Sequence, residues 1–278
     1  MVAGEKRLRI QVEGLHFRYP GAPSCALGGV DLEFEQGRFY AVLGRNGSGK
    51  STLARCLNGL LRPEKGRVVT CGLDTSEASN QLEIRRGVAM VFQNPDTQLV
   101  ASSVEEDVAF GPENLGLGPE EIRERVDSAL ELVGISHLAK RQPLRLSQGQ
   151  KQLVAIAGAL AMKPAFLISD ESTSMLDYVS RLRVLELFEE LRRMGIGIIH
   201  ITHFLEEATL ADEVFVLESG RLVAGGTPPE TLGDPERVRA LGLDPLVVTM
   251  VACELGELGH VVPGDVLNVK ELLSWLYA

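Results

Sequence analysis

The sequence has few cysteines, and they are not paired. Cys25, Cys56, Cys71 and Cys253 are spread over 278 residues with no CxxC spacing. Metal sites and disulfide frameworks need cysteines at short, regular intervals. We therefore expect the four thiols to be small apolar side chains of a protein in a reducing compartment.

Long apolar runs are missing as well. No stretch approaches the roughly 18 apolar residues that would span a bilayer. The first residues, Met1–Arg7, lead into an alternating pattern and contain no apolar signal-peptide core. We expect a cytoplasmic chain that is held at a membrane only through another protein.

Positive charge is in deficit. Lys and Arg total 28 against 38 Asp and Glu, which gives a formal net charge of −10. Nucleic-acid backbones and anionic lipids are bound by clustered cations, so this balance argues against both as default partners. The composition, 45% hydrophobic and 24% charged, is that of an ordinary globular protein and excludes disordered and fibrous classes.

Two kinds of strand pattern are present. Apolar and polar residues alternate over residues 8–43, which predicts antiparallel strands with turns at Pro20-Gly21 and Gln36-Gly37. Four nearly continuous apolar runs predict strands buried on both faces of a parallel sheet. These runs are Phe39–Leu43, Val88–Phe92, Ala165–Ile168 and Ile196–Ile201, and helical patterns follow at Lys50–Asn58, Glu120–Val133, Gln150–Met162 and Tyr178–Met194. The alternation predicts an α/β fold with a mostly parallel sheet, flanking helices and an antiparallel β subdomain.

Composition divides the chain into a main domain, residues 1–226, and a small acidic appendage, residues 227–278. Between the second and third buried runs the pattern is mostly helical for about 70 residues, which is too long for a simple crossover. We interpret about residues 94–163 as an inserted helical subdomain. The appendage has two amphipathic stretches, Pro245–Leu258 and Asn268–Leu276.

The segment Gly44–Thr52 fits the pattern GxxxxGK[ST] directly after the first buried run. Glycines let backbone N–H groups curl around a phosphate, and the following helix directs its positive end at the same anion. Lys50 is expected to reach the β- and γ-phosphate oxygens, and the Ser51 hydroxyl to ligate Mg²⁺. The pattern predicts a triphosphate site in a P-loop NTPase core; the alternative is a glycine-rich strand–helix turn. The residues expected to bind ATP here are Asn46, Gly47, Ser48, Gly49, Lys50, Ser51 and Thr52.

Two acids end the third buried run. The carboxyl ends of parallel strands face the ligand crevice, so Asp170 and Glu171 are expected beside the phosphate loop. Adjacent residues of an extended strand point to opposite sides, which suits two tasks. Asp170 would hold Mg²⁺ and Glu171 would take a proton from the attacking water. The alternative is a solvated pair of acids at a strand end.

Further motifs make the sequence resemble the ATP-binding cassette (ABC) ATPases. They are Leu146-Ser147-Gln148-Gly149-Gln150, which is similar to the family's signature LSGGQ, Gln93 of the Q-loop, Ser174–Asp177 of the D-loop, the switch histidine His203, and Tyr19, the aromatic that stacks on adenine. The resemblance implies that two chains enclose ATP and Mg²⁺ between the phosphate loop of one and the signature of the other. The catalytic residues that it implies are Glu171, His203 and Gln93. The Mg²⁺ ligands are Ser51, Gln93 and Asp170, and the residues that bind ATP in trans are Ser147, Gly149 and Gln150.

Each of these motifs also has a local interpretation. Ser147 and Gln150 have the spacing of a capping box at a helix start. Taken alone, His203 fits a hydrogen-bonded histidine at a strand end, Gln93 a surface amide, and Tyr19 a half-buried strand aromatic.

Three segments, Phe92–Asp96, Ala155–Met162 and Thr173–Asp177, resemble the energy-coupling factor (ECF) and cobalt-type importer ATPases. That resemblance implies an ATPase subunit at the cytoplasmic face of the membrane, with a second identical or sister ATPase and an integral membrane subunit docked near Gln93. Uptake of a vitamin or a transition-metal ion is the implied task, and the appendage is then a dimerisation element. The alternatives are a soluble ABC ATPase that does not transport and a P-loop phosphotransferase acting on a small molecule.

The sequence departs from the family pattern at four positions. Gln148 replaces the second glycine of the signature, Leu153 stands where arginine is common, and Ser172 and Tyr178 stand where proline is common. We expect Gly149 to keep the close backbone approach to phosphate and the Gln148 side chain to turn outward.

Overall fold

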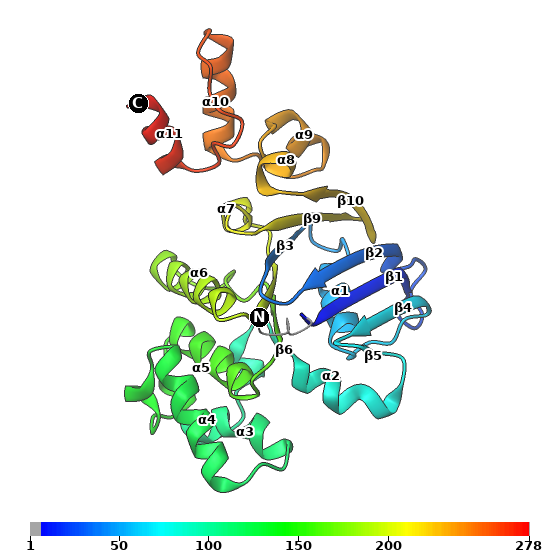
Figure 1. The fold of residues 1–278 in the computed structure, drawn as a ribbon, viewed down its shortest axis with the longest axis vertical. Helices are drawn as coiled ribbons and strands as arrows, with labels where there is room; N and C mark the ends of the chain where they lie inside the picture. Colours follow the sequence, from blue (N-terminus) through cyan, green and yellow to red (C-terminus); the bar gives the residue numbers. More distant parts are fainter. Residues whose placement is uncertain (1–6, 278) are drawn as a thin grey trace, which may run out of the picture.

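A six-stranded sheet forms the centre of the computed structural model, which describes residues 7–277 (Figure 1). The strand order is β10 (Arg221–Gly226), β9 (Glu213–Glu218), β3 (Phe39–Leu43), β8 (Gly197–Ile201), β7 (Phe166–Asp170) and β6 (Val88–Val91). All pairs are parallel except β9 with β10. Every residue of β3, β7 and β8 is buried, as their continuous apolar runs require.

A second, antiparallel sheet lies beside the first. Its order is β2 (Leu27–Glu35), β1 (Arg9–Phe17), β4 (Lys65–Thr70) and β5 (Leu73–Asp74). The inward residues of β1 and β2 share one hydrophobic cluster with α1 (Lys50–Leu57) and with side chains of the central sheet. The phosphate-loop helix α1 is therefore held from both sheets.

Helices cover the central sheet and form a separate group at one end. On the sheet lie α2 (Gln81–Gly87), α6 (Tyr178–Arg193) and α7 (Leu205–Ala208). The group consists of α3 (Val104–Asn114), α4 (Pro119–Leu132) and α5 (Gln148–Ala161), with short 3-10 turns at Pro95–Thr97, Ser136–Leu138 and Pro143–Arg145; a further 3-10 turn, Ala78–Asn80, leads into α2. Figure 1 shows this helical group below the sheets.

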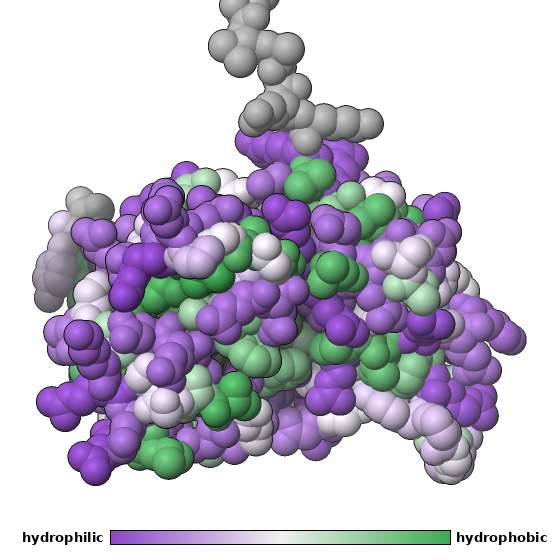
Figure 2. Space-filling view, turned by 90° about the horizontal axis from the view of Figure 1, so that it is seen from below, coloured by the Kyte–Doolittle hydropathy of each residue, from purple (hydrophilic) through white to green (hydrophobic). Residues whose placement is uncertain are grey.

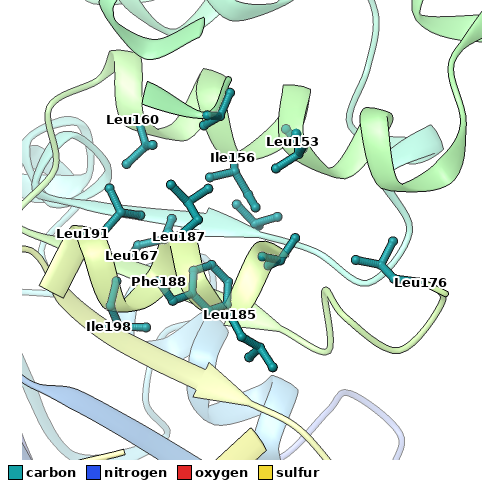
Figure 3. Close-up of a cluster of buried hydrophobic side chains, with 14 of the residues drawn as sticks. Leu153, Ile156, Leu160, Leu167, Leu176, Leu185, Leu187, Phe188, Leu191 and Ile198 are labelled. Atoms are coloured by element: carbon teal, nitrogen blue, oxygen red, sulfur yellow. The ribbon is translucent and has the colours of Figure 1, made fainter. Parts of the chain in front are cut away.

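The main hydrophobic core joins that helical group to the central sheet. In Figure 3, Leu153 and Ile156 of α5 face Leu187 and Phe188 of α6. Leu167 of β7 lies between these two helices and belongs to the same buried cluster.

The C-terminal residues form two structural parts. Helices α8 (Pro228–Leu232) and α9 (Pro235–Ala240) bury Leu232 and Val238 in the main core. Helices α10 (Val247–Glu257) and α11 (Val269–Leu276) share a small cluster of their own and lie at the end of the molecule opposite the helical group (Figure 1). Of the described C-terminal residues, α10 and α11 form the part whose own cluster lies outside the main core, although Leu267 between them joins that core.

The expected strands and helices agree with the structure to within two residues at each end. The sequence analysis did not identify the hairpin β9–β10, which continues the central sheet, or the short elements β4, β5 and α2. Within residues 7–277, no helix has both the length and the apolar character to cross a membrane. The expectation that the chain begins without a signal-peptide core falls mainly on residues 1–6, which lie outside the described residues.

Candidate nucleotide-binding site

The phosphate loop connects β3 to α1 as the sequence predicts. Gly49 immediately precedes α1 with a φ of 106°, and a Cβ there would lie 2.6 Å from the carbonyl oxygen of Ala26. Only glycine fits this turn. No side chain caps α1, so its first N–H groups remain available to an anion.

Lys50 is buried in this loop with only 4% of its side chain exposed. Its Nζ donates to the carbonyl oxygens of Gly44 at 2.6 Å and Arg45 at 3.1 Å, and lies 3.7 Å from Oε1 of Glu171. Burial lowers the pKa of Lys50, and the neighbouring carboxylates of Glu171 and Asp170 partly oppose this shift. The ammonium group thus lies inside the phosphate loop and faces the cleft acids.

Ser51 and Asp170 bring two oxygen ligands together. The Ser51 hydroxyl donates to Oδ1 of Asp170 at 2.8 Å. Burial raises the pKa of Asp170, with the Ser51 hydrogen bond acting in the opposite direction. Within residues 7–277, no cluster of three or more His, Cys, Asp or Glu side chains forms a metal site.

The backbone at Glu171 differs from the sequence prediction. The expectation was an extended chain that turns Asp170 and Glu171 to opposite sides. Instead, Glu171 has a φ of 51°, in the left-handed region that non-glycine residues seldom adopt, and its N–H donates to the carbonyl of Ile201 at 3.0 Å. Both carboxylates therefore line the same cleft.

The cleft has a volume of about 640 Å³ and collects residues from the loop between β1 and β2, the phosphate loop and α1, the end of β7 and the chain after β6. Gln93 lines it and donates from Nε2 to Oγ of Ser174 at 3.2 Å. Ser174 in turn donates to the carbonyl oxygen of Glu171 at 2.8 Å. The lining residues are Tyr19, Ala26, Asn46, Gly47, Ser48, Gly49, Lys50, Ser51, Thr52, Arg55, Phe92, Gln93, Asn94, Thr97, Asp170 and Glu171.

Tyr19 stands at the mouth of this cleft. Its ring packs edge-on against Phe17 at 5.0 Å, and its hydroxyl lies 3.2 Å from Oγ1 of Thr52. The residue is 36% exposed.

Arg55 is a cleft residue that the sequence analysis missed. It lies one helical turn after Ser51 on α1, and its charge lowers the pKa of Asp170 against the larger effect of burial. Its position could have been predicted from its spacing, because Arg55 stands four residues after Ser51 on the helix that begins at the phosphate loop.

The signature residues and His203 do not line this cleft. Ser147 is exposed at the start of α5, and the capping box is present: Ser147 Oγ accepts from the Gln150 N–H at 3.3 Å, and Gln150 Oε1 accepts from the Ser147 N–H at 3.0 Å. Gly149 is buried, and a Cβ there would lie 2.4 Å from Oγ of Ser180. His203 is exposed, with its ring 4.1 Å from that of Phe204.

Gln148 reaches a neighbouring segment of its own chain. Its Nε2 donates to Oδ2 of Asp96 at 3.0 Å, and Lys151 Nζ donates to Oδ1 of the same carboxylate at 2.6 Å. Asp96 lies in the 3-10 turn that follows the Q-loop. The side chain that replaces a signature glycine thus ties α5 to that turn.

Comparisons with known proteins identify the family. The family model described as "ABC transporter" matches residues 27–174. A relative in Symbiobacterium thermophilum, the energy-coupling factor transporter ATP-binding protein EcfA1, is 53% identical over 96% of each chain. The cobalt import ATP-binding protein CbiO of Syntrophus aciditrophicus is 45% identical, again over 96% of each.

Two solved structures extend the comparison to the fold. CbiO1 of Clostridium perfringens, titled as part of the ABC transporter complex cbiONQ, has a TM-score of 0.77 at 36% identity and covers 92% of this chain and all of its own. The dimeric bacterial cassette MJ0796 bound to ADP and phosphate has a TM-score of 0.71 at 26% identity, covering 79% of this chain and 98% of its own.

Fold, phosphate loop and comparisons together define an ATP-binding cassette ATPase. Within that class, the chain belongs to the family of energy-coupling factor and cobalt-type transporter ATP-binding subunits.

Proposed function

We propose that this chain is the ATP-hydrolysing subunit of an ECF-type importer and that two ATPase chains form each pair of sites. One observation carries the proposal: the cleft gathers Lys50, Asp170 and Glu171, whereas the signature residue Ser147 is exposed outside it. Because Glu171 and Lys50 share one cleft and the signature of the same chain lies outside it, a second chain would supply the signature that completes the site.

Within the cleft, the phosphate-loop residues would bind the triphosphate of ATP. The backbone from Asn46 to Gly49 and the α1 N–H groups face the anion, Ser51 and Thr52 add hydroxyls, and Lys50 supplies the cation. Tyr19, an exposed aromatic that lines the cleft, would stack on the adenine base.

Mg²⁺ fits the oxygen ligands present. The Ser51 hydroxyl and the Asp170 carboxylate already lie at 2.8 Å, and Gln93 adds an amide oxygen on the same cleft wall. Hydroxyl, carboxylate and amide oxygens are the ligands that this ion prefers. When bound, it would neutralise charge on the phosphate oxygens.

Glu171 would accept the proton of the attacking water, with Gln93 and His203 as the other catalytic residues. The Glu171 carboxylate lies 3.7 Å from Lys50 Nζ, so it faces the place of the terminal phosphate. Gln93 is tied to the backbone of Glu171 through Ser174. His203 follows the neighbouring strand β8 and is free to approach the same phosphate.

Ser147, Gly149 and Gln150 would bind ATP of the partner chain, whether an identical or a sister ATPase. The start of α5 offers backbone N–H groups and a serine hydroxyl at the surface. Residues 227–278 were interpreted as a dimerisation appendage. The packing of α10 and α11 outside the main core supports α10 and α11 as its pairing part.

A membrane subunit would dock beside the Q-loop, which places the chain at the cytoplasmic face of a membrane. A groove of about 490 Å³ opens between α2, β6 and the helical group; Phe92 and Gln98 line it, with Leu82 and Phe110 more than half exposed. Figure 2 views the molecule from below Figure 1 and shows hydrophobic side chains gathered across the hollowed middle of that face. Import of a vitamin or a transition-metal ion, which the family resemblance implies, also requires that the ATPase bind a membrane subunit.

Substitution of Glu171 by Gln tests the catalytic assignment. The amide cannot accept a proton, so we expect ATP binding to persist while steady-state hydrolysis falls by about 10²–10⁴-fold. Lys50→Ala should instead weaken nucleotide binding, because a buried cation is removed. Turnover of Glu171→Gln within about threefold of the parent would refute the assignment.

Co-purification tests the transport role. The tagged chain should retain an integral membrane protein, and Phe110→Asp in the groove should release it. Leu210→Asp, at an exposed position outside the groove, is the matched control. Retention by both variants would exclude the groove as the docking site, and absence of any membrane protein with the parent would favour a soluble ABC ATPase.

A further inference from the structure

Glu207 of α7 is the centre of a buried polar network that no sequence motif identifies. Only 2% of its side chain is exposed. One carboxylate oxygen, Oε2, lies 2.7 Å from Nε2 of His200 and accepts from the hydroxyls of Thr202 at 2.5 Å and Thr173 at 3.0 Å. A carboxylate this deep is retained only when its hydrogen bonds are made.

The other carboxylate oxygen is held more loosely. Glu207 Oε1 and Nε of Arg181 lie 3.7 Å apart, and both atoms are buried without a hydrogen-bond partner. The Arg181 guanidinium lies over the ring of Phe204 at 3.9 Å. Burial raises the pKa of Glu207, but the hydrogen bonds from His200, Thr202 and Thr173, together with the electrostatic effect of His200, outweigh it and lower the pKa.

This carboxylate connects segments that carry different site residues. Thr173 lies two residues after Glu171. Thr202 directly precedes His203, and its Oγ1 also accepts from the N–H of Phe204 at 3.1 Å. Arg181 lies in the first turn of α6, which Asp177 of the D-loop caps.

We propose that Glu207 is a positioning residue that fixes the Glu171 segment and the His203 segment relative to each other. The proposal rests on the catalytic roles given above to those two residues. Glu207 does not line the nucleotide cleft, so its effect reaches ATP only through its neighbours. The competing view is that the network only stabilises the fold.

Thr173 offers a test that keeps the buried carboxylate in place. Thr173→Val preserves shape and removes the hydroxyl that holds the Glu171 segment, whereas Thr173→Ser retains it. On the full-length chain, we expect Thr173→Val to lower the single-turnover hydrolysis rate by about tenfold or more with ATP affinity within about twofold of the parent, since small displacements of catalytic groups act on rate. Thr173→Ser should restore the rate. Glu207→Gln should behave like Thr173→Val, and Glu206→Gln, at the adjacent exposed position, should behave like the parent.

The outcomes separate this proposal from the catalytic assignment. If Glu171→Gln hydrolyses ATP at the parental rate, the assigned catalytic roles fail. If Glu171→Gln is inactive but Thr173→Val and Glu207→Gln keep the parental rate, the positioning role alone is overturned. A parallel loss of rate, ATP affinity and unfolding free energy in Thr173→Val also overturns it, because a purely structural network would act that way. If Glu207→Gln does not fold, the Thr173 pair decides.

Discussion

Gly149 is required by a contact inside its own chain. The sequence argument attributed the need for glycine to a phosphate of the partner's nucleotide. The structure adds that a Cβ at this position would lie 2.8 Å from Cβ of Ser180, as well as 2.4 Å from its hydroxyl. The signature turn and the start of α6 therefore touch through backbone and a small side chain.

We expect Gly149→Ala to lower the free energy of unfolding by about 1–3 kcal/mol, because overpacking forces α5 and α6 apart. Ser180→Gly removes the colliding atoms, so the double variant Gly149→Ala/Ser180→Gly should regain part of that loss. Denaturant unfolding of both variants and of Ser180→Gly alone measures the coupling. Additive losses would show that the two residues do not collide.

Thiol reactivity should follow burial. Burial raises the pKa of Cys56 to about 12 and that of Cys71 to about 11, so little thiolate forms at either near neutral pH. Cys253 is exposed. Under limited iodoacetamide at pH 8, mass spectrometry should find Cys253 modified first and Cys56 only after unfolding. Early labelling of Cys56 would contradict the packing around α1.

Most cleft residues could be predicted from sequence, because a phosphate loop is a local pattern with fixed spacing. Lys50, Ser51 and Asp170 meet as the strand order demands. The left-handed turn at Glu171 could not be predicted, since it depends on the hydrogen bond to Ile201 from another strand. Glu207 was missed for the same reason: its partners are distant in sequence or carry no motif.

At the scale of elements, buried parallel strands were predictable and the edge hairpin was not. Every residue of β3, β7 and β8 is buried, whereas β10 alternates between half-buried and exposed residues. The boundary at 226/227 remains a prediction. Because Leu232 and Val238 lie in the main core, a truncation that tests the appendage belongs after Leu246.

A chain that ends after Leu246 should bind ATP as the parent does and dissociate into monomers at higher protein concentration. It loses α10, α11 and the segment between them, whose exposed apolar side chains include Leu258, Val261 and Leu276. Analytical ultracentrifugation of both chains over a range of concentrations gives the dimer constants. Unchanged constants would refute the pairing role, and lost ATP binding would show that these helices support the cassette itself.

At the scale of the whole molecule, the separation of signature and cleft makes a prediction about mixed dimers. Gly149→Asp in one chain should silence only the site built on the other chain's Lys50 and Glu171, because a side chain at this position collides with Ser180 and displaces the signature turn proposed to face the partner. The test is a dimer that pairs a Gly149→Asp chain with a Glu171→Gln chain. Whether one of its two sites remains free of both changes depends on whether the signature acts in cis or in trans.

If the signature acts in trans, the Gly149→Asp change and the Glu171→Gln change fall in the same site, and the other site of that dimer remains intact. If it acts in cis, each site carries one change and hydrolysis is lost. Single-turnover hydrolysis by the mixed dimer, with a dimer carrying both changes on both chains as the inactive reference, decides between them. Loss of all hydrolysis would refute the trans arrangement.

The contact of Gln148 and Lys151 with Asp96 joins the signature helix to the turn that follows Gln93. Gln93 belongs to this chain's own cleft, whereas α5 faces the proposed partner. A movement of the groove beside that turn would therefore reach the partner's nucleotide through the two side-chain contacts between α5 and Asp96. We therefore expect contact between one chain and the membrane subunit to control the rate of ATP hydrolysis at the site built on the neighbouring chain's phosphate loop.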